Sequence, residues 1–88
     1  MITIKLHKDF VKQVANLKPA QKKRLQAAME LFQEHPGHPN LYNHPLTGEW
    51  NGYRSIAFGG DWRAHFELTD DDTIAWFVAC GTHNQLYK

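Results

Sequence analysis

The sequence contains almost no cysteine: Cys80 is the single thiol among 88 residues. An internal disulfide is therefore impossible, and a chain of this kind suits a reducing compartment. We expect Cys80 to be a buried structural thiol, because it ends an apolar stretch. A Cys–His hydrolase built on Cys80 is disfavoured for the same reason, since a nucleophilic thiol needs a polar and partly accessible environment. A phosphate-cradling glycine loop is also missing.

Long hydrophobic runs are missing as well. No segment approaches the roughly 20 apolar residues that are needed to cross a bilayer. The start, Met-Ile-Thr-Ile-Lys-Leu, has neither the apolar core nor the cleavage site of a secretory signal. We therefore expect a cytoplasmic protein with no membrane role. Residues 1–88 are expected to form one domain, because so short a chain supports a single core.

The net charge is small, at +1, but it is unevenly distributed. Residues 1–35 carry seven Lys or Arg against three Asp or Glu, whereas residues 36–88 carry three against six. A polyanion should therefore be drawn first to the N-terminal half. There Lys22, Lys23 and Arg24 lie together and form a candidate RNA-binding surface. The alternative is that this trio is simply a solvated helix face.

The N-terminal half has the pattern of one strand followed by two helices. Residues 2–6 alternate apolar and polar side chains, as an edge strand does. Helical spacing begins at Asp9, a good N-cap, and is interrupted at Lys18. Pro19 suits the first turn of a second helix, which should end in the proline-rich segment 35–40.

The C-terminal half has the pattern of strands, expected at residues 52–58, 61–68 and 73–80. We predict an α+β fold, in which the N-terminal strand and the two-helix hairpin pack on one face of a mostly antiparallel sheet and leave the other face open. If the loop of the first hairpin has an odd number of residues, Ile56 lies on the apolar face; if it has an even number, Arg54 lies on the polar face. We favour the odd number. Either way the polar face carries Asp61, Arg63, His65 and Glu67.

The candidate chemistry lies in a set of polar residues, namely His44, Arg54, Asp61, Arg63, His65 and His83. Imidazoles, arginines and a carboxylate suit metal-free cleavage of RNA, which needs a base, an acid and a cation at the phosphate. A zinc site formed by His35, His38 and His44, joined by His83, is the rival. It lacks paired cysteines and the two-histidine helical spacing of zinc proteases. We therefore expect neither a metal nor another cofactor.

Three sequence blocks carry a family resemblance. They are His44-Pro45-Leu46-Thr47-Gly48-Glu49-Trp50-Asn51-Gly52-Tyr53-Arg54, then Gly60-Asp61-Trp62-Arg63, then Gly81-Thr82-His83-Asn84-Gln85-Leu86-Tyr87. Together they resemble the YafQ branch of the RelE toxins. The resemblance implies a RelE-like fold and the toxin of a type II toxin–antitoxin system. It also implies a metal-independent endoribonuclease that cuts mRNA on the ribosome and is silenced by a cognate antitoxin.

The resemblance also suggests roles for particular residues. His44 and His83 would serve as acid and base in an order left open, and Asp61 would orient one of them or act as the base. The alternative is that Asp61, which follows a glycine pair, is only a turn former. Arg63 resembles a phosphate clamp, and Tyr87 stands where the family has its closing aromatic, which would stack on a base or donate a proton. Arg54 would contact RNA or order its loop. Trp62, although part of the motif, is expected in the core.

One position departs from the family pattern. The family often has a further histidine three residues after the arginine of Gly-Tyr-Arg, and Ala57 stands there instead. His65 would then supply the missing imidazole, or it is an ordinary surface histidine. Two alternatives follow. The chain could be a ParE-like toxin that inhibits DNA gyrase without cutting RNA, or a catalytically weakened module that only binds its antitoxin.

Overall fold

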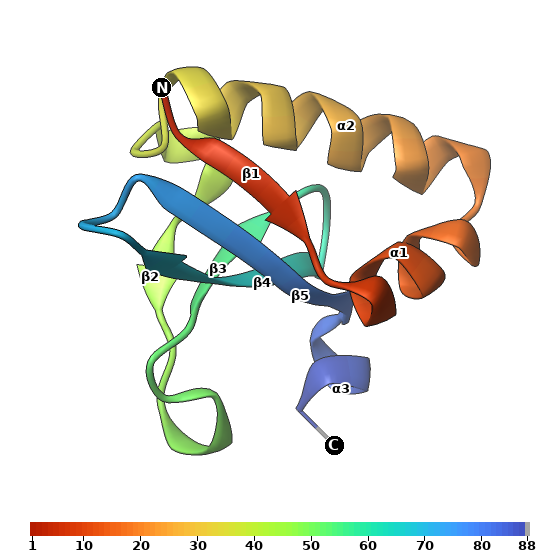
Figure 1. Ribbon diagram of the computed structural model, residues 1–88. Helices are drawn as coiled ribbons and strands as arrows, with labels where there is room; N and C mark the ends of the chain where they lie inside the picture. The colour runs from red at the N-terminus through yellow and green to blue at the C-terminus, as the bar shows by residue number, and fades with distance from the viewer. Residues whose placement is uncertain (88) are drawn as a thin grey trace.

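The computed structural model describes residues 1–87, and Figure 1 shows their arrangement. Five strands form one sheet in the order β1-β5-β4-β3-β2. The strands are β1 (Thr3–Leu6), β2 (His44–Pro45), β3 (Arg54–Ala57), β4 (Trp62–Thr69) and β5 (Ile74–Thr82). β1 runs parallel to β5 and the other neighbouring pairs are antiparallel. The predicted α+β fold, with a mostly antiparallel sheet and an N-terminal edge strand, is confirmed.

The helices lie on both sides of this sheet but are of very different size. α1 (Lys8–Ala15) and α2 (Pro19–Glu34) cover one face, whereas α3 (His83–Leu86) lies on the other side with the turn that precedes β3 (Figure 1). Phe10 of α1 and Phe32 of α2 each lie 5.6 Å from Phe77 of β5, measured between ring centroids. Phe32 also meets Phe66 of β4 at 4.8 Å. The expected packing of the helical hairpin on one face is therefore confirmed.

The two long helices begin and end for local reasons. Pro19 begins α2, as predicted, because the first position of a helix needs no backbone N–H donor. The prediction that Asp9 caps α1 was wrong. His7 is the N-cap, and its Nδ1 accepts the backbone N–H of Asp9 at 3.2 Å. α1 ends at Ala15 rather than at Lys18. The backbone N–H groups of Asn16 and Leu17 close a turn onto the carbonyls of Gln13 and Val14. Lys18 is extended, because a residue before proline avoids helical angles.

The β3–β4 hairpin has the odd loop that the apolar pattern favoured. Ile56 pairs with Ala64 and Ser55 pairs with His65. The backbone N–H of Phe58 donates to the carbonyl of Trp62 at 3.1 Å, so the loop consists of residues 59–61. Ile56, Ala64 and Phe66 are consequently buried beneath the helices, and the side chains that alternate with them point to the opposite face.

Two short elements were not predicted, namely β2 and α3. Each has fewer residues than a periodic pattern needs to become visible. No helix within residues 1–87 has the length and apolar character of a membrane span.

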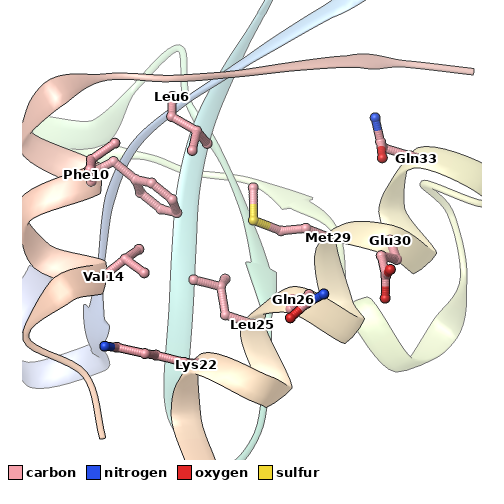
Figure 2. Close-up of a pocket in the computed structure, with 10 residues that line it drawn as sticks. Leu6, Phe10, Val14, Lys22, Leu25, Gln26, Met29, Glu30 and Gln33 are labelled. Atoms are coloured by element: carbon pink, nitrogen blue, oxygen red, sulfur yellow. The ribbon is translucent and has the colours of Figure 1, made fainter. Parts of the chain in front are cut away.

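An apolar groove runs between the two long helices (Figure 2). It has a volume of about 440 Å³. Phe10 and Val14 of α1 face Leu25 and Met29 of α2 across it, and Leu6 lies at the end of β1. Leu6 is 46% exposed, so the groove is accessible from outside. Its rim is polar and includes Lys22, Gln26, Glu30 and Gln33.

Candidate active site

A row of polar side chains crosses the sheet on the face opposite α1 and α2. His44 of β2 pairs with Ser55 of β3, and Ser55 pairs with His65 of β4. Directly paired residues point to the same side of a sheet. The edge strand β2 therefore brings His44 onto the same face as His65, although 20 residues lie between them in the sequence.

A second row lies beside the first. Arg63 of β4 pairs with Ala57 on one side and with Gly81 on the other. Because strand side chains alternate, Arg63 shares the face of His65. Ala57, where the family pattern has a histidine, is therefore the direct neighbour of Arg63, and Ser55 rather than Ala57 lies opposite His65.

His65 is fully buried, and this corrects the expectation that it lies on an open face. Its exposed fraction is 0%. The ring of Trp50 lies 4.4 Å from the imidazole at 80°, and the ring of Tyr87 lies 5.6 Å away. Trp50 Nε1 donates to the carbonyl of Leu86 at 3.1 Å, which ties the turn before β3 to α3. Alternation gave the direction of His65 correctly, but it does not reveal what folds over that face.

The buried imidazole is held in its neutral form. The pKa of His65 is lowered from 6.5 to about 4. Burial is the largest cause, and the nearby His44, His83 and Arg63 also contribute to this lowering. Neither ring nitrogen of His65 has a hydrogen-bond partner among residues 1–87, and the same holds for the buried Ser55 Oγ. A buried polar group without a partner costs stability. The centre of this face is therefore not optimised for folding.

His44 has a defined tautomer. Its Nδ1 donates to the backbone carbonyl of Tyr42 at 2.8 Å, since a carbonyl oxygen can only accept. The neutral ring then carries its lone pair on Nε2, the atom that could take a proton from a substrate. Tyr42 also stacks on His44, with ring centroids 4.4 Å apart and an interplanar angle of 34°.

The segment that carries His44 is anchored by two hydrogen bonds of the Asn43 side chain. Asn43 Nδ2 donates to the carbonyl of Pro36 at 3.0 Å, and Arg54 Nε donates to Asn43 Oδ1 at 2.9 Å. Arg54 pairs with Phe66, so it points to the helix side of the sheet, away from Arg63. The bond from Arg54 to Asn43 is what the interpretation of Arg54 as a residue that orders this loop requires, and both that role and its contact with RNA stay predictions.

α3 brings His83 and Tyr87 to the same region. The backbone N–H of His83 donates to the carbonyl of Asp61 at 2.9 Å, which joins the helix to the β3–β4 turn. The rings of His83 and Tyr87 lie 4.5 Å apart at 34°. Burial raises the pKa of Tyr87, and the positive charge of Arg63 opposes that rise. The phenol is therefore protonated at neutral pH and remains a donor.

A capping box starts α3. Thr82 Oγ1 accepts the backbone N–H of Gln85, and Gln85 Oε1 accepts the backbone N–H of Thr82. Gly81 leaves room for the Gln85 side chain, because a Cβ at that position would lie 2.8 Å from Gln85 Oε1 and would push it aside. The sequence Thr-His-Asn-Gln contains the signal for this cap, so α3 was detectable in principle.

Arg63 and Asp61 differ in how firmly they are held. Arg63 is half-buried, and its Nη1 donates to the carbonyls of Gly60 at 2.8 Å and Trp62 at 2.9 Å. Asp61 is exposed, and its carboxylate forms no hydrogen bond or ion pair with any residue that the structure describes. Its link to the site is through its backbone. Trp62 packs against the core, as expected.

Other predicted residues lie apart from this cluster. Cys80 is buried, as predicted, and burial raises the pKa of its thiol to about 11. The trio Lys22, Lys23 and Arg24 is exposed on α2, on the other side of the sheet from His65. Within residues 1–87, no three His, Cys, Asp or Glu side chains are placed to hold a metal ion together.

Three residues of the site were missed from the sequence. Ser55 could have been found, because the odd hairpin loop puts it directly opposite His65. Trp50 lies in a motif, but nothing in the motif shows that it covers His65. Tyr42 could not have been found, since it lies before a short strand and belongs to no repeating apolar pattern that would predict where its side chain points.

The whole chain has known relatives. Residues 2–88 match the model of a family described as a bacterial toxin of type II toxin–antitoxin systems, YafQ. The mRNA interferase toxin YafQ of Escherichia coli strain K12 is 40% identical over 50 residues, which span 56% of this chain and about half, 52%, of that relative. The E. coli DinJ–YafQ toxin–antitoxin complex contains a chain that is 30% identical, with a TM-score of 0.74 over 99% of this chain and 98% of that chain.

A more distant likeness concerns the fold alone. The archaeal RelE–RelB complex from Pyrococcus horikoshii OT3 contains a chain that is 18% identical. It matches with a TM-score of 0.75 over 96% of this chain and 97% of that chain. The RelE-like fold predicted from the sequence is therefore confirmed.

Proposed function

This chain belongs to the YafQ family of bacterial type II toxins, and we propose that it is a ribosome-dependent mRNA interferase, an endoribonuclease that needs no metal. One observation carries the proposal: the fold gathers His44, His83 and Arg63 around the buried His65. His44 and Arg63 share its sheet face, and the ring of Tyr87 lies 5.6 Å from His65 and 4.5 Å from His83. Two histidines and an arginine around one point are the groups that cleavage of an RNA phosphodiester requires. The naming of an E. coli relative as an mRNA interferase supports the same activity.

The proposed reaction uses the 2′-OH of the substrate as the nucleophile. The 2′-oxygen forms a bond to the adjacent phosphorus while the bond from phosphorus to the 5′-oxygen breaks. His44 Nε2 takes the 2′-OH proton, which its tautomer allows, and protonated His83 gives a proton to the leaving 5′-oxygen. The products are a 2′,3′-cyclic phosphate and a free 5′-OH. His44 and His83 end with exchanged protonation states, which solvent restores.

The other residues stabilise or position the reacting groups. Arg63 would neutralise the charge that develops on the phosphorane, because guanidinium groups bind phosphate oxygens in a bidentate manner. Asp61 would orient His83, whose backbone it already holds at 2.9 Å. Tyr87 lies beside His83 and would donate a hydrogen bond or stack on a base. His65 reaches RNA only if Tyr87 or Trp50 moves, so we assign it to positioning rather than to proton transfer.

The absence of an imidazole at Ala57 is the main argument for a weakened enzyme. Ala57 pairs with Arg63 across the two strands, and its methyl group cannot exchange a proton. We therefore expect the chemistry to be shared between His44 and His83. A catalytically weakened module that only binds its antitoxin remains the second candidate, and Ala57 is the observation that favours it.

Mapping of mRNA 5′ ends in a translating extract tests the proposal. New ends should appear with the wild-type protein and should vanish without ribosomes. Arg63→Ala and His83→Gln should each abolish them, while His35→Gln, the same replacement at an exposed histidine of the loop after α2, should not. A folded wild-type protein that produces no new ends would contradict the nuclease and favour the binding module.

The ribosome and mRNA are proposed partners, and the basic trio of α2 is the proposed contact with ribosomal RNA. Lys22, Lys23 and Arg24 are exposed and lie away from the histidine cluster, so they could bind rRNA while mRNA occupies the other face. Binding through phosphate contacts falls steeply as salt is added. Replacing the trio with glutamine should flatten the salt dependence of ribosome binding, as measured by cosedimentation.

A cognate antitoxin is the further proposed partner. The family is one of type II toxin–antitoxin systems, and the apolar groove of Figure 2 offers a place for the apolar side of an antitoxin segment. Val11 and Leu6 line the groove and are 49% and 46% exposed, so the groove presents a contiguous apolar patch, a feature that marks interaction sites. Val11→Lys should weaken antitoxin binding measured by calorimetry, whereas mRNA cleavage by the free toxin should be unchanged.

A further inference from the structure

Tyr42 combines features that are uncommon in a surface tyrosine. It is 63% exposed. Its backbone has φ 48°, in the left-handed region that bulky side chains rarely adopt. One face of its ring lies against the imidazole of His44, at 4.4 Å between centroids. A large part of the remaining ring surface is therefore open to solvent, directly beside a candidate catalytic histidine.

The neighbouring residues hold Tyr42 in this position. Its backbone N–H donates to the carbonyl of Pro39 at 3.2 Å, which closes the turn before it. The next residue, Asn43, is fixed by its bonds with the Pro36 carbonyl and Arg54 Nε. The Tyr42 carbonyl in turn accepts from His44 Nδ1. The strained conformation is thus held from both sides, and such strain tends to occur at functional sites.

We propose that Tyr42 is a stacking platform for an unpaired nucleobase of the RNA substrate, one nucleotide away from the 2′-OH that His44 deprotonates. This inference rests on the proposed function. Bases of single-stranded RNA commonly stack on aromatic side chains, and any base can do so because each has a π-face. The chemistry next to Tyr42 favours RNA over an apolar protein segment, because His44 and the polar row on its sheet face would hold the phosphate and sugar of the same strand.

The platform has a consequence for the choice of cleavage position. A purine offers a larger stacking surface than a pyrimidine, so the wild-type protein should prefer a purine at the stacked position. The contribution of the tyrosine hydroxyl should be small, because stacking uses the ring. Loss of the ring should therefore weaken binding and relax the base preference together.

A binding experiment with a non-cleavable RNA tests this inference. The probe is a ribosome programmed with a short mRNA that carries 2′-fluoro groups in place of the 2′-OH nucleophiles and 2-aminopurine at one position at a time. Wild-type protein should quench the fluorescence of one position in a saturable manner. Tyr42→Ala should weaken binding about 5- to 150-fold, the range expected for one stacked base, and Tyr42→Leu should weaken it nearly as much. Tyr42→Phe should bind within about twofold of wild type.

The controls separate this inference from the nuclease itself. Thermal unfolding and circular dichroism establish that each variant is folded, and mRNA cleavage in a translating extract is measured in parallel. A wild-type protein that quenches the probe but cuts nothing would overturn the nuclease and keep the platform. Equal binding by Tyr42→Ala and wild type, or no saturable quenching by wild type, would overturn the platform. So would a Tyr42→Ala variant that loses only antitoxin binding.

Discussion

The two faces of the central sheet are both buried at their centre, but they are filled in opposite ways. On the helix side Phe66 has 0% exposure and meets Phe32 and Phe77 at 4.8 and 5.0 Å. On the other side the adjacent residue, His65, also has 0% exposure but leaves two ring nitrogens without a partner among residues 1–87. Burial stabilises an apolar ring and penalises an unpaired polar one. One face therefore stabilises the fold, and the other contains a buried polar ring that lowers its stability.

The largest expected effect is on the helix side. Phe66→Ala removes a ring that contacts two other phenylalanines, and a change of this kind in a core costs about 3–5 kcal/mol. Because domains of this size are only marginally stable, we expect most of the variant to be unfolded at 37 °C. Urea unfolding followed by circular dichroism would measure the loss. A cost below about 1 kcal/mol would mean that the core is not centred on Phe66.

The next effect is a pH dependence that comes from the opposite face. The pKa of His65 is about 4 in the folded protein and 6.5 when unperturbed, so between these values the unfolded chain binds more protons. The free energy of unfolding should therefore rise as the pH increases from about 4 to 6.5 and should level off above that. By linkage the total change is at most about 3–4 kcal/mol. Urea midpoints across this range would measure it, and His65→Leu should remove most of the dependence.

The helix side was also the face that could be read from the sequence. Ile56, Ala64 and Phe66 alternate with polar residues over enough positions to define both the strands and the odd hairpin loop. Pro19 marks the start of α2 because its ring leaves few other places for it in a helix. These features are local and repeat along the chain, so the pattern predicts them without knowledge of the rest of the fold.

The histidine face could be read only in part. The direction of Arg63 and His65 followed from alternation, and the motif resemblance pointed to His44 and His83. The cover over His65 did not follow, because it depends on Trp50 and Tyr87, which are far from His65 in the sequence and lie in short, non-periodic segments. Stacking of Tyr42 on His44 depends on the left-handed backbone conformation of Tyr42 itself, which an apolar pattern does not predict.

A smaller effect, with a sign opposite to that of Phe66→Ala, is expected for His65→Leu. The leucine has a similar size and leaves no unpaired nitrogen in the interior, so the protein should become about 1–2 kcal/mol more stable at pH 7. Cleavage of mRNA should fall at the same time, because the rings that flank His65 would lose their polar neighbour. Chemical unfolding and 5′-end mapping would be measured on the same preparation. A destabilised variant would indicate that the His65 nitrogens are satisfied by bound water, and the contrast between the faces would then be weaker.

The smallest expected effect separates the two contributions of Trp50. Trp50→Phe keeps an aromatic ring over His65 but loses the 3.1 Å bond from Nε1 to the Leu86 carbonyl, which should cost about 0.5–1.5 kcal/mol. Amide exchange should become faster at Tyr87, whose backbone N–H donates to the His83 carbonyl at the end of α3. The pKa of His65, measured by NMR titration, should stay near 4 in this variant. Trp50→Ala, in contrast, should uncover the imidazole and move its pKa toward 6.5, because water then solvates the charged form. If both variants left that pKa unchanged, the neutrality of His65 would come from its charged neighbours rather than from the cover over this face.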